Sequence, residues 1–400
     1  MPDARNGFLT EELSESLAWC QGDVGLIAGG DEAVCQAPPS AGLESFMRAE
    51  VSQRLGCSCY QRSVKRRGYR NGSYARDLLT SYGWLEGLVV PRVREGGFQP
   101  LCLEKYRRRQ RAVDRVLLEA FLLGHATRKV RRLCRSLFGA EISPQTVSNI
   151  VRELDQGVQQ FHRRQFGDEY RFVYLDGLWI TLSKPVKAKK VLLVALGVRL
   201  DGSQELLGFQ VASSESESWW WGFLSDLKQR GFGGSQLEVI VSDGAGGLVK
   251  AIQGLYPRVK HQLCTFHKAM DLGAHLVNKR HRHRIIADAL HIFGASTETE
   301  ARRRLRGFTD TWTEKESKAV RAFVRNFDCC LIYLESPDPI RTMLKTSNPI
   351  ERYLEEIRRR IIPMRAFNNT KSVERIVYGI IAYVLNQQPD MPDTEFTQLA

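Results

Sequence analysis

The sequence contains no run of eighteen apolar residues, which is about the length that a membrane-spanning helix requires. Its first residues include Glu11, Glu12 and Glu15, where a signal peptide would need basic residues before an apolar stretch. We therefore expect a cytoplasmic protein that neither crosses nor binds a membrane.

The sequence also lacks the cysteine spacing of a disulfide framework or a zinc finger, because its nine cysteines are scattered and odd in number. This favours reduced thiols in a cytosol. We find no internal repeat and no low-complexity tract. With 43% hydrophobic and 26% charged residues, most of the 400-residue chain is expected to fold, as two or three domains.

Negative charge is scarce in residues 60–140. Residues 1–59 hold three arginines and nine acids, whereas residues 60–140 hold nineteen lysines or arginines and only six acids. A basic block of this kind attracts polyanions by releasing their counterions, so nucleic acid is the favoured partner. A solvated basic face, or attraction to an anionic membrane surface, would also fit the charge alone.

Changes in composition predict four parts of the chain. Residues 1–60 mix acids with glycine and proline, which indicates a loosely ordered or helical arm. Residues 61–105 show short strand-like runs and form a small basic β segment. Residues 106–165 have helical periodicity, and residues 166–400 contain the α/β pattern described below.

Three amphipathic helices are predicted within residues 106–165, and the last two are separated by a short turn containing Gly139. The third helix opens at Ser143-Pro144, an N-cap followed by proline at the first helical position. This is a helix-turn-helix pattern, although similar helix pairs also occur in bundles. The polar residues expected to face a DNA major groove are Gln145, Thr146, Ser148, Asn149 and Arg152, and those expected to bind phosphates are Arg128, Lys129, Arg131 and Arg132.

Strand patterns return after residue 166. Three strands are expected at 172–182, 190–200 and 205–212, followed by a helix at 219–230 and a fourth strand at 237–242. Residues 268 to about 345 read as an all-helical block that interrupts the sheet, and two further helices follow it. The pattern predicts an α/β sheet with a helical insertion.

Two acids lie at strand positions suited to metal binding. Asp176 lies inside the first strand among apolar neighbours, and Asp243 ends the fourth strand, at the edge where α/β sheets usually carry their sites. In a ribonuclease-H-like sheet the first and fourth strands are neighbours, so the two carboxylates would meet there. The dipeptide Asp243-Gly244 also fits an ordinary turn.

A third carboxylate is expected at the start of a later helix. With Asn348 as the N-cap and Pro349 at the first helical position, Glu351 is either a metal ligand or a structural capping-box glutamate. Glu355 lies on the same helical face and is the rival third ligand. Arg358, two turns beyond Glu351, is placed to hold DNA phosphate.

Cys264 and His267 offer two ligands, but a structural zinc site needs four and no second pair has matching spacing. The run Trp219-Trp220-Trp221 indicates core packing rather than a base-stacking platform, because its members point in different directions around a helix. Neither feature decides the function on its own.

Taken together, these segments resemble the Mutator-type DDE transposases of bacterial insertion sequences over roughly residues 69–388. The acids are 67 and 108 residues apart, and the family fills the long second gap with a helical insertion. The matching segments are Tyr69-Arg70-Asn71-Gly72-Ser73-Tyr74, Pro91-Arg92-Val93-Arg94-Glu95-Gly96, Tyr174-Leu175-Asp176-Gly177, Trp221-Gly222-Phe223-Leu224, Arg230-Gly231, Ser242-Asp243-Gly244, Cys264-Thr265-Phe266-His267 and Ser347-Asn348-Pro349-Ile350-Glu351-Arg352.

The resemblance implies a ribonuclease-H-like catalytic domain in which Asp176, Asp243 and Glu351 hold two Mg²⁺ ions, with Mn²⁺ as a substitute. It implies double-stranded DNA as the partner, both the inverted repeats of the element and the target. It also implies a homo-oligomer that pairs two DNA ends in a bacterial nucleoid. Cys264 and His267 match a family signature whose role is less settled.

Two other functions are open to a chain with this pattern. A catalytically inactive, transposase-derived regulator would bind DNA through the same basic block, but it would have no use for the three acids. A tyrosine or serine recombinase would link covalently to DNA, and no constellation of Arg, His and Tyr suggests that chemistry. Metal-dependent nicking separates the first rival from a transposase, and covalent trapping separates the second.

Overall fold

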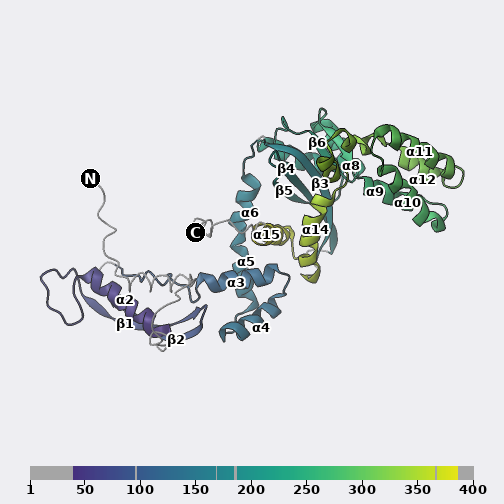
Figure 1. The fold of residues 1–400 in the computed structure, drawn as a ribbon. Helices are drawn as coiled ribbons and strands as arrows, with labels where there is room; N and C mark the ends of the chain where they lie inside the picture. Colours follow the sequence, from purple (N-terminus) through teal and green to yellow (C-terminus); the bar gives the residue numbers. More distant parts are fainter. Residues whose placement is uncertain (1–38, 95–96, 168, 184–186, 365–366, 386–400) are drawn as a thin grey trace, which may run out of the picture. The chain divides into compact units, whose positions relative to one another are not determined.

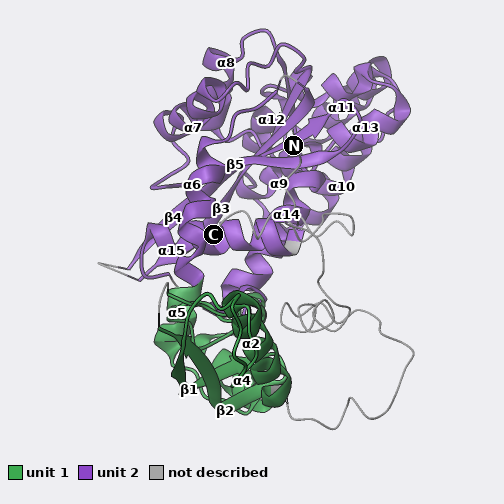
Figure 2. Ribbon diagram, turned by 90° about the vertical axis from the view of Figure 1, so that its left-hand side faces the viewer, with its two compact units in different colours: residues 1–121, 125–150 green, residues 122–124, 151–400 purple. Residues whose placement is uncertain are grey.

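The computed structural model describes residues 39–94, 97–167, 169–183, 187–364 and 367–385 (Figure 1). The chain divides into two compact units, one comprising residues 1–121 and 125–150 and the other residues 122–124 and 151–400 (Figure 2). The expectation for residues 1–38 lies outside the described part. Within the described residues, no helix has the length and apolar character needed to cross a membrane.

Unit 1 begins with a helix packed on a two-stranded sheet. Strands β1 (Arg70–Thr80) and β2 (Gly83–Val93) pair antiparallel, and α2 (Pro39–Leu55) lies against β2. A carboxylate oxygen of Glu44 accepts a hydrogen bond from the Val89 N–H at 2.9 Å, which ties the helix to the strand. Burial of apolar side chains from both elements stabilises this part, whose core is Leu43, Met47, Leu78, Leu88, Val90 and Leu103.

Three helices follow in the order α3 (Arg111–Leu122), α4 (Thr127–Phe138) and α5 (Pro144–Arg152). Helix α4 ends at Gly139, whose φ of 66° is the left-handed conformation that glycine adopts without strain. The Ser143 hydroxyl accepts the Thr146 N–H at 3.1 Å, as an N-cap does. The helices and the turn expected here are therefore present.

Unit 2 contains a five-stranded mixed sheet in the order β5-β4-β3-β6-β7. Strands β3 (Tyr170–Leu182), β4 (Ala188–Arg199) and β5 (Gln204–Ala212) are antiparallel, whereas β6 (Val239–Ser242) and β7 (Lys260–Leu263) run parallel to β3. The predicted α/β class is confirmed, and the first and fourth strands are neighbours. The short β7 and the helix before it, α8 (Gly246–Leu255), were not predicted.

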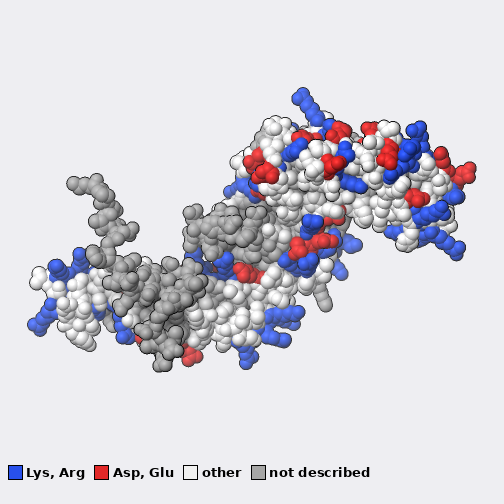
Figure 3. All heavy atoms as spheres, viewed as in Figure 1, with Lys and Arg blue, Asp and Glu red and all other residues white. Residues whose placement is uncertain are grey.

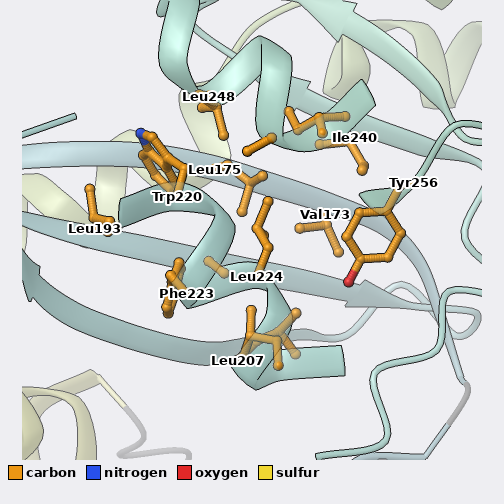
Figure 4. Packing of buried hydrophobic residues seen from close by; sticks show 14 of the residues in the cluster. Val173, Leu175, Leu193, Leu207, Trp220, Phe223, Leu224, Ile240, Leu248 and Tyr256 are labelled. Atoms are coloured by element: carbon orange, nitrogen blue, oxygen red, sulfur yellow. The ribbon is translucent and has the colours of Figure 1, made fainter. Parts of the chain in front are cut away.

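Helices α7 (Glu217–Gln229) and α8 cover one face of this sheet. In Figure 4, Trp220, Phe223 and Leu224 of α7 point toward Val173 and Leu175 of β3. Because side chains alternate along a strand, the even-numbered residues of β3 face the opposite side. The tryptophan prediction is confirmed, since Trp220 is 1% exposed and its neighbour in sequence at position 221 is 42% exposed.

The opposite face of the sheet is covered by the end of the chain. Helix α14 (Asn348–Ile361) packs against β3 and β4, and the short 3₁₀ turn Ile362–Met364 follows it. Helix α15 (Thr370–Ile380) continues as a π turn, Ile381–Leu385, and packs against α6 (Leu154–Arg163). The even-numbered positions of β3 therefore face α14.

A helical block lies between β7 and α14 in the chain. Its helices are α9 (Thr265–Asp271), α10 (Arg282–Phe293), α11 (Glu298–Trp312), α12 (Ser317–Val324) and α13 (Asp338–Leu344), and its 3₁₀ turns are Leu272–Ala274, Lys279–His281, Asp328–Cys330 and Ile332–Glu335. The block has a core of its own, built around Phe293, Phe308, Trp312, Phe323 and Phe327.

Candidate active site

The first two acids of the candidate site lie on neighbouring parallel strands. In the β3–β6 ladder Tyr174 pairs with Val241 and Leu175 pairs with Ser242, so the next step places Asp176 beside Asp243. Paired residues of parallel strands point to the same face, and adjacent strands lie about 4.8 Å apart. Both carboxylates therefore project toward the α14 side of the sheet, just where β6 ends.

The third acid comes from the first turn of α14. The Glu351 N–H donates to the Ser347 carbonyl at 3.0 Å, and the Ser347 hydroxyl donates to the Glu351 carboxylate. The helix begins at Asn348, so the N-cap is Ser347, one residue earlier than predicted. The Glu351 carboxylate is thus engaged by the Ser347 side chain rather than by a capping-box contact to the backbone of Asn348.

The three carboxylates act on one another electrostatically. Burial first, and then the negative charges of Asp243 and Glu351, raise the pKa of Asp176 to about 7, against the opposing effects of the Gly177 N–H and His267. The Gly177 N–H donates to the Asp176 carboxylate at 2.7 Å. Asp243 and Glu351, which come from distant parts of the chain, therefore both lie near enough to Asp176 for their charges to act on its carboxyl group.

Asp243 combines the turn role with its place in this cluster. Its carboxylate accepts the Ala245 N–H at 3.0 Å, and Gly244 adopts a φ of 88°, as an Asp-Gly turn requires. The hydroxyl of the preceding Ser242 lies 2.8 Å from Nε2 of His261 on β7. The turn interpretation and the metal-ligand interpretation, which competed in the sequence, are compatible here.

Cys264 and His267 lie at the start of α9, next to the third carboxylate. One ligand atom each from Cys264, His267 and Glu351 lie within 4.8 Å of one another, and His267 Nδ1 is 3.9 Å from the Glu351 carboxylate. Hydrogen bonding to Cys264, followed by nearby negative charge, raises the pKa of His267 to about 9 despite its partial burial. Burial alone would raise the pKa of the Cys264 thiol, but hydrogen bonds from His267 and Ser347 lower it.

Sequence reasoning missed two side chains at this site. Ser347 stands four residues before Glu351, one helical turn away, and that spacing was the available signal. Burial, followed by the negative charge of Asp243, raises the pKa of Glu215, just before α7, which also accepts a hydrogen bond from Trp179. A Cβ at Gly177 would lie 2.7 Å from the Glu215 carboxylate, so this strand position admits only glycine without a shift of neighbouring atoms. No local pattern in the sequence marks Glu215.

The other residues predicted on α14 lie on its solvent side. Glu355 and Arg358 are both exposed, one and two helical turns beyond Glu351. Within the described part of the chain Arg358 forms no ion pair with a carboxylate, so its exposed guanidinium is open to an anion. Glu355 has no part in the electrostatic cluster around Asp176.

The residues predicted to bind DNA in the helix-turn-helix region lie on α4 and α5, and all of them except Arg152 belong to unit 1. Most are exposed, but Thr146 and Ser148 are half-buried. Gln145 Nε2 donates to the Asn149 side chain at 2.9 Å, and the Ser148 hydroxyl donates to the Pro144 carbonyl. A hollow of about 330 Å³ on this helix pair is lined by Arg128, Arg131, Arg132, Arg135, Glu141 and Pro144.

Comparisons with known proteins cover most of the chain. The sequence pattern of the transposase family named Mutator matches residues 17–388. The transposase for insertion sequence element ISRM5 of Rhizobium meliloti (strain 1021) is 32% identical over 339 residues, which are 84% of each chain. The transposase for element IS256 in transposon Tn4001 of Staphylococcus aureus is 31% identical, over 85% of this chain and 87% of its own.

A solved structure, the catalytic domain of Mos1 mariner transposase, is also similar to part of the chain. It covers 46% of this chain and 96% of its own at 14% identity, with a TM-score of 0.17.

Proposed function

This chain belongs to the Mutator family of transposases, and from that premise we propose that it is the transposase of an insertion sequence. It would bind the terminal inverted repeats of its element, cut a strand at each end, and join the ends to target DNA. The observation that supports this proposal is the position of Asp176 beside the end of β6, where the nearby charges of Asp243 and Glu351 both raise its pKa. The resemblance drawn from the sequence motifs is confirmed at the level of the family.

The donor set of this site fits hard divalent cations. Three carboxylates offer the oxygen ligands that Mg²⁺ and Mn²⁺ prefer, and the pKa of Asp176 is raised by burial first and then by the charges of Asp243 and Glu351. Bound by Asp176, Asp243 and Glu351, a pair of Mg²⁺ ions would supply the Lewis acidity that activates water, and then a DNA 3′ hydroxyl, toward a phosphodiester.

The role of the side chains is to hold the cations and to orient the DNA phosphate. Asp176 must lose its proton to act as a ligand, and its pKa of about 7 places this step near neutral pH. Exposed Arg358, two turns along α14 from Glu351, would hold a DNA phosphate beside the carboxylates. Because the nucleophiles are water and a DNA hydroxyl, no covalent link between protein and DNA forms.

Unit 1 carries the proposed DNA-binding surface. Four arginines line the hollow on α4 and α5; Arg131 and Arg135 pair there with Glu141, and the net positive charge would attract phosphates. The exposed polar residues of α5 would read base edges. On this basis residues 61–165 recognise the inverted repeats and residues 166–400 perform catalysis. Pairing of two ends requires more than one copy of the chain, so we expect a dimer or larger assembly on DNA in the bacterial nucleoid.

Replacing the second carboxylate tests this function. Asp243→Asn should abolish Mg²⁺-dependent cleavage of inverted-repeat DNA while leaving binding of that DNA largely intact, because the amide cannot replace the charged ligand. The measurement is single-turnover cleavage of an end-labelled duplex, beside a binding assay in EDTA. Cleavage by the variant at the wild-type rate would show that the site is assigned to the wrong residues.

The same assay separates the alternative function. If the wild-type protein binds the repeats but never nicks them with Mg²⁺ or Mn²⁺, the chain is a DNA-binding regulator derived from a transposase. If a nicked substrate traps a covalent adduct, a recombinase mechanism replaces the proposed one.

A further inference from the structure

Ser347 stands at the centre of a cluster that includes Cys264, His267 and Glu351. Its hydroxyl oxygen lies 3.3 Å from Cys264 Sγ and 3.3 Å from His267 Nδ1, and it hydrogen-bonds to the Glu351 carboxylate. Its backbone N–H donates to Cys264 Sγ at 3.4 Å. Ser347 and Cys264 are both buried, so the contact between them is shielded from water, whereas His267 and Glu351 are partly exposed.

The number of available protons limits which hydrogen bonds this cluster can form at the same time. The Ser347 hydroxyl has one proton, and the contact with Glu351 is the shortest it makes. Its oxygen then accepts from His267 Nδ1, while Cys264 Sγ accepts the Ser347 backbone N–H in addition to its hydrogen bond with His267. The hydroxyl fills the space between the three candidate ligand atoms, which argues against a zinc ion bound there by Cys264, His267 and Glu351.

We propose that Cys264 and His267 are positioning residues that fix the Glu351 carboxylate through Ser347. Cys264 anchors the backbone at the start of α14, and His267 orients the hydroxyl that holds the carboxylate. The Thr265 hydroxyl donates to the Lys345 carbonyl at 3.0 Å, a second tie between the same two segments. Partners of this kind typically contribute 10- to 100-fold to metal affinity because they set the direction of the ligand.

A pair of substitutions at one position tests this role, which rests on the proposed function. His267→Leu removes the donor to Ser347, whereas His267→Asn keeps an amide N–H near the place of Nδ1. We expect His267→Leu to raise the Mg²⁺ concentration for half-maximal DNA cleavage by about 10-fold or more, and His267→Asn to recover part of that loss. Ser347→Ala, a small change in a buried place, should behave like His267→Leu.

The controls are the thermal midpoint and DNA binding in EDTA, both of which should change little. Equal Mg²⁺ requirements for His267→Leu, His267→Asn and the wild-type protein would overturn the positioning role. So would a loss of cleavage that follows only a fall in the thermal midpoint. Absence of cleavage by the wild-type protein would instead refute the proposed function.

A different observation supports a second inference, about the helical block. Lys279, Arg280, Arg282, His283 and Arg284 are exposed and nearly consecutive, and Figure 3 shows basic side chains over α10. Among the described residues none of the five pairs with a carboxylate. Other arginines of the block do form ion pairs: Arg302 with Glu298 and Asp328, Arg304 with Glu300, and Arg341 with Asp338. The basic segment therefore keeps its positive potential.

The basic segment is held in shape by a buried carboxylate. Glu316 is 0% exposed and accepts the N–H groups of Val277 at 2.7 Å and Asn278 at 3.0 Å. The same carboxylate lies 2.8 Å from His281 Nδ1. Burial of such a charge is costly unless every oxygen is hydrogen-bonded, and these contacts meet that condition. A charged surface fixed in advance loses little conformational entropy when it binds a ligand.

We infer that residues 279–284 bind the phosphate backbone of duplex DNA, in addition to the DNA contacts proposed for unit 1. The positive charge lies on a rigid segment, it is unpaired, and it is exposed, so it complements a regular row of phosphates. Within the proposed function, this surface would hold DNA on the catalytic unit.

Salt dependence gives a direct test. Lys279→Gln with Arg280→Gln removes two charges, so the slope of log binding constant against log salt for a mixed-sequence duplex should fall by about 1.8. The matched control, Arg303→Gln with Arg306→Gln, removes two exposed charges from α11 of the same block and should leave the slope unchanged. Equal slopes for the two double variants would overturn the inference. If the wild-type protein fails to bind duplex DNA, the proposed function itself is wrong.

Discussion

Asp176 should destabilise the folded protein when no metal is bound, and Asp176→Asn should relieve that effect. The pKa of Asp176 is about 7 in the fold against an ordinary value of 3.8, chiefly because the carboxyl is buried. A group with a raised pKa keeps its proton in the folded state up to pH 7, while the unfolded chain releases it above pH 3.8. Stability is therefore lost as the pH rises from about 4 through 7.

The size of the effect follows from the difference between the pKa of about 7 in the folded protein and the ordinary value of 3.8. Each tenfold change in acidity between the two states corresponds to about 1.4 kcal/mol of stability. At alkaline pH the free energy of unfolding is therefore reduced by at most about 4 kcal/mol, and part of this reduction is already present at pH 5. Between pH 5 and pH 8 we expect the free energy of unfolding of Asp176→Asn to gain about 2 to 3 kcal/mol over the wild-type protein.

Urea denaturation in EDTA at the two pH values measures this difference. Asp201→Asn is the control, because hydrogen bonds from Ser203 lower the pKa of Asp201, so this carboxyl stays ionised in both states from pH 5 to pH 8. Added Mg²⁺ should stabilise the wild-type protein at pH 8 more than the Asn variant. A gap between Asp176→Asn and wild type that is the same at pH 5 and pH 8 would refute the electrostatic reasoning.

Three further outcomes are expected. Gly177→Ala should slow DNA cleavage in a single-turnover assay and lower the thermal midpoint, because its Cβ would lie 2.7 Å from the Glu215 carboxylate; unchanged values would contradict the packing seen here. Burial lowers the pKa of His261 to about 4 from 6.5, so stability should fall by up to about 3 kcal/mol as the pH drops from 6.5 through 4, and denaturation of His261→Gln should lack that slope. Cleavage should proceed with Mg²⁺ or Mn²⁺ and fail with Ca²⁺, which tolerates looser geometry and more ligands; equal rates with Ca²⁺ would count against the proposed site.

Much of the fold could be predicted because the sequence patterns that mark its helices and strands are local. Strand β3 appears as a long apolar run, and the helix pair in unit 1 is marked by Gly139, Ser143 and Pro144. The short strand β7, Lys260–Leu263, gave no such signal, because four residues with three polar side chains fit a loop equally well. Its strand character comes from pairing with β6, a tertiary contact.

The sequence by itself determined the family and predicted the three acids, because the order and spacing of short motifs persist along the chain regardless of how it folds. From the sequence alone, Asp243 could be either a turn residue or a metal ligand, and Glu351 could be either a helix-capping residue or a metal ligand. Only the tertiary structure showed that Ser347 joins Glu351 to Cys264 and His267, and that Glu215 lies against Gly177. Such contacts link residues as far as 83 positions apart, and their existence depends on which strands pair and which helices cover them, which no local pattern encodes.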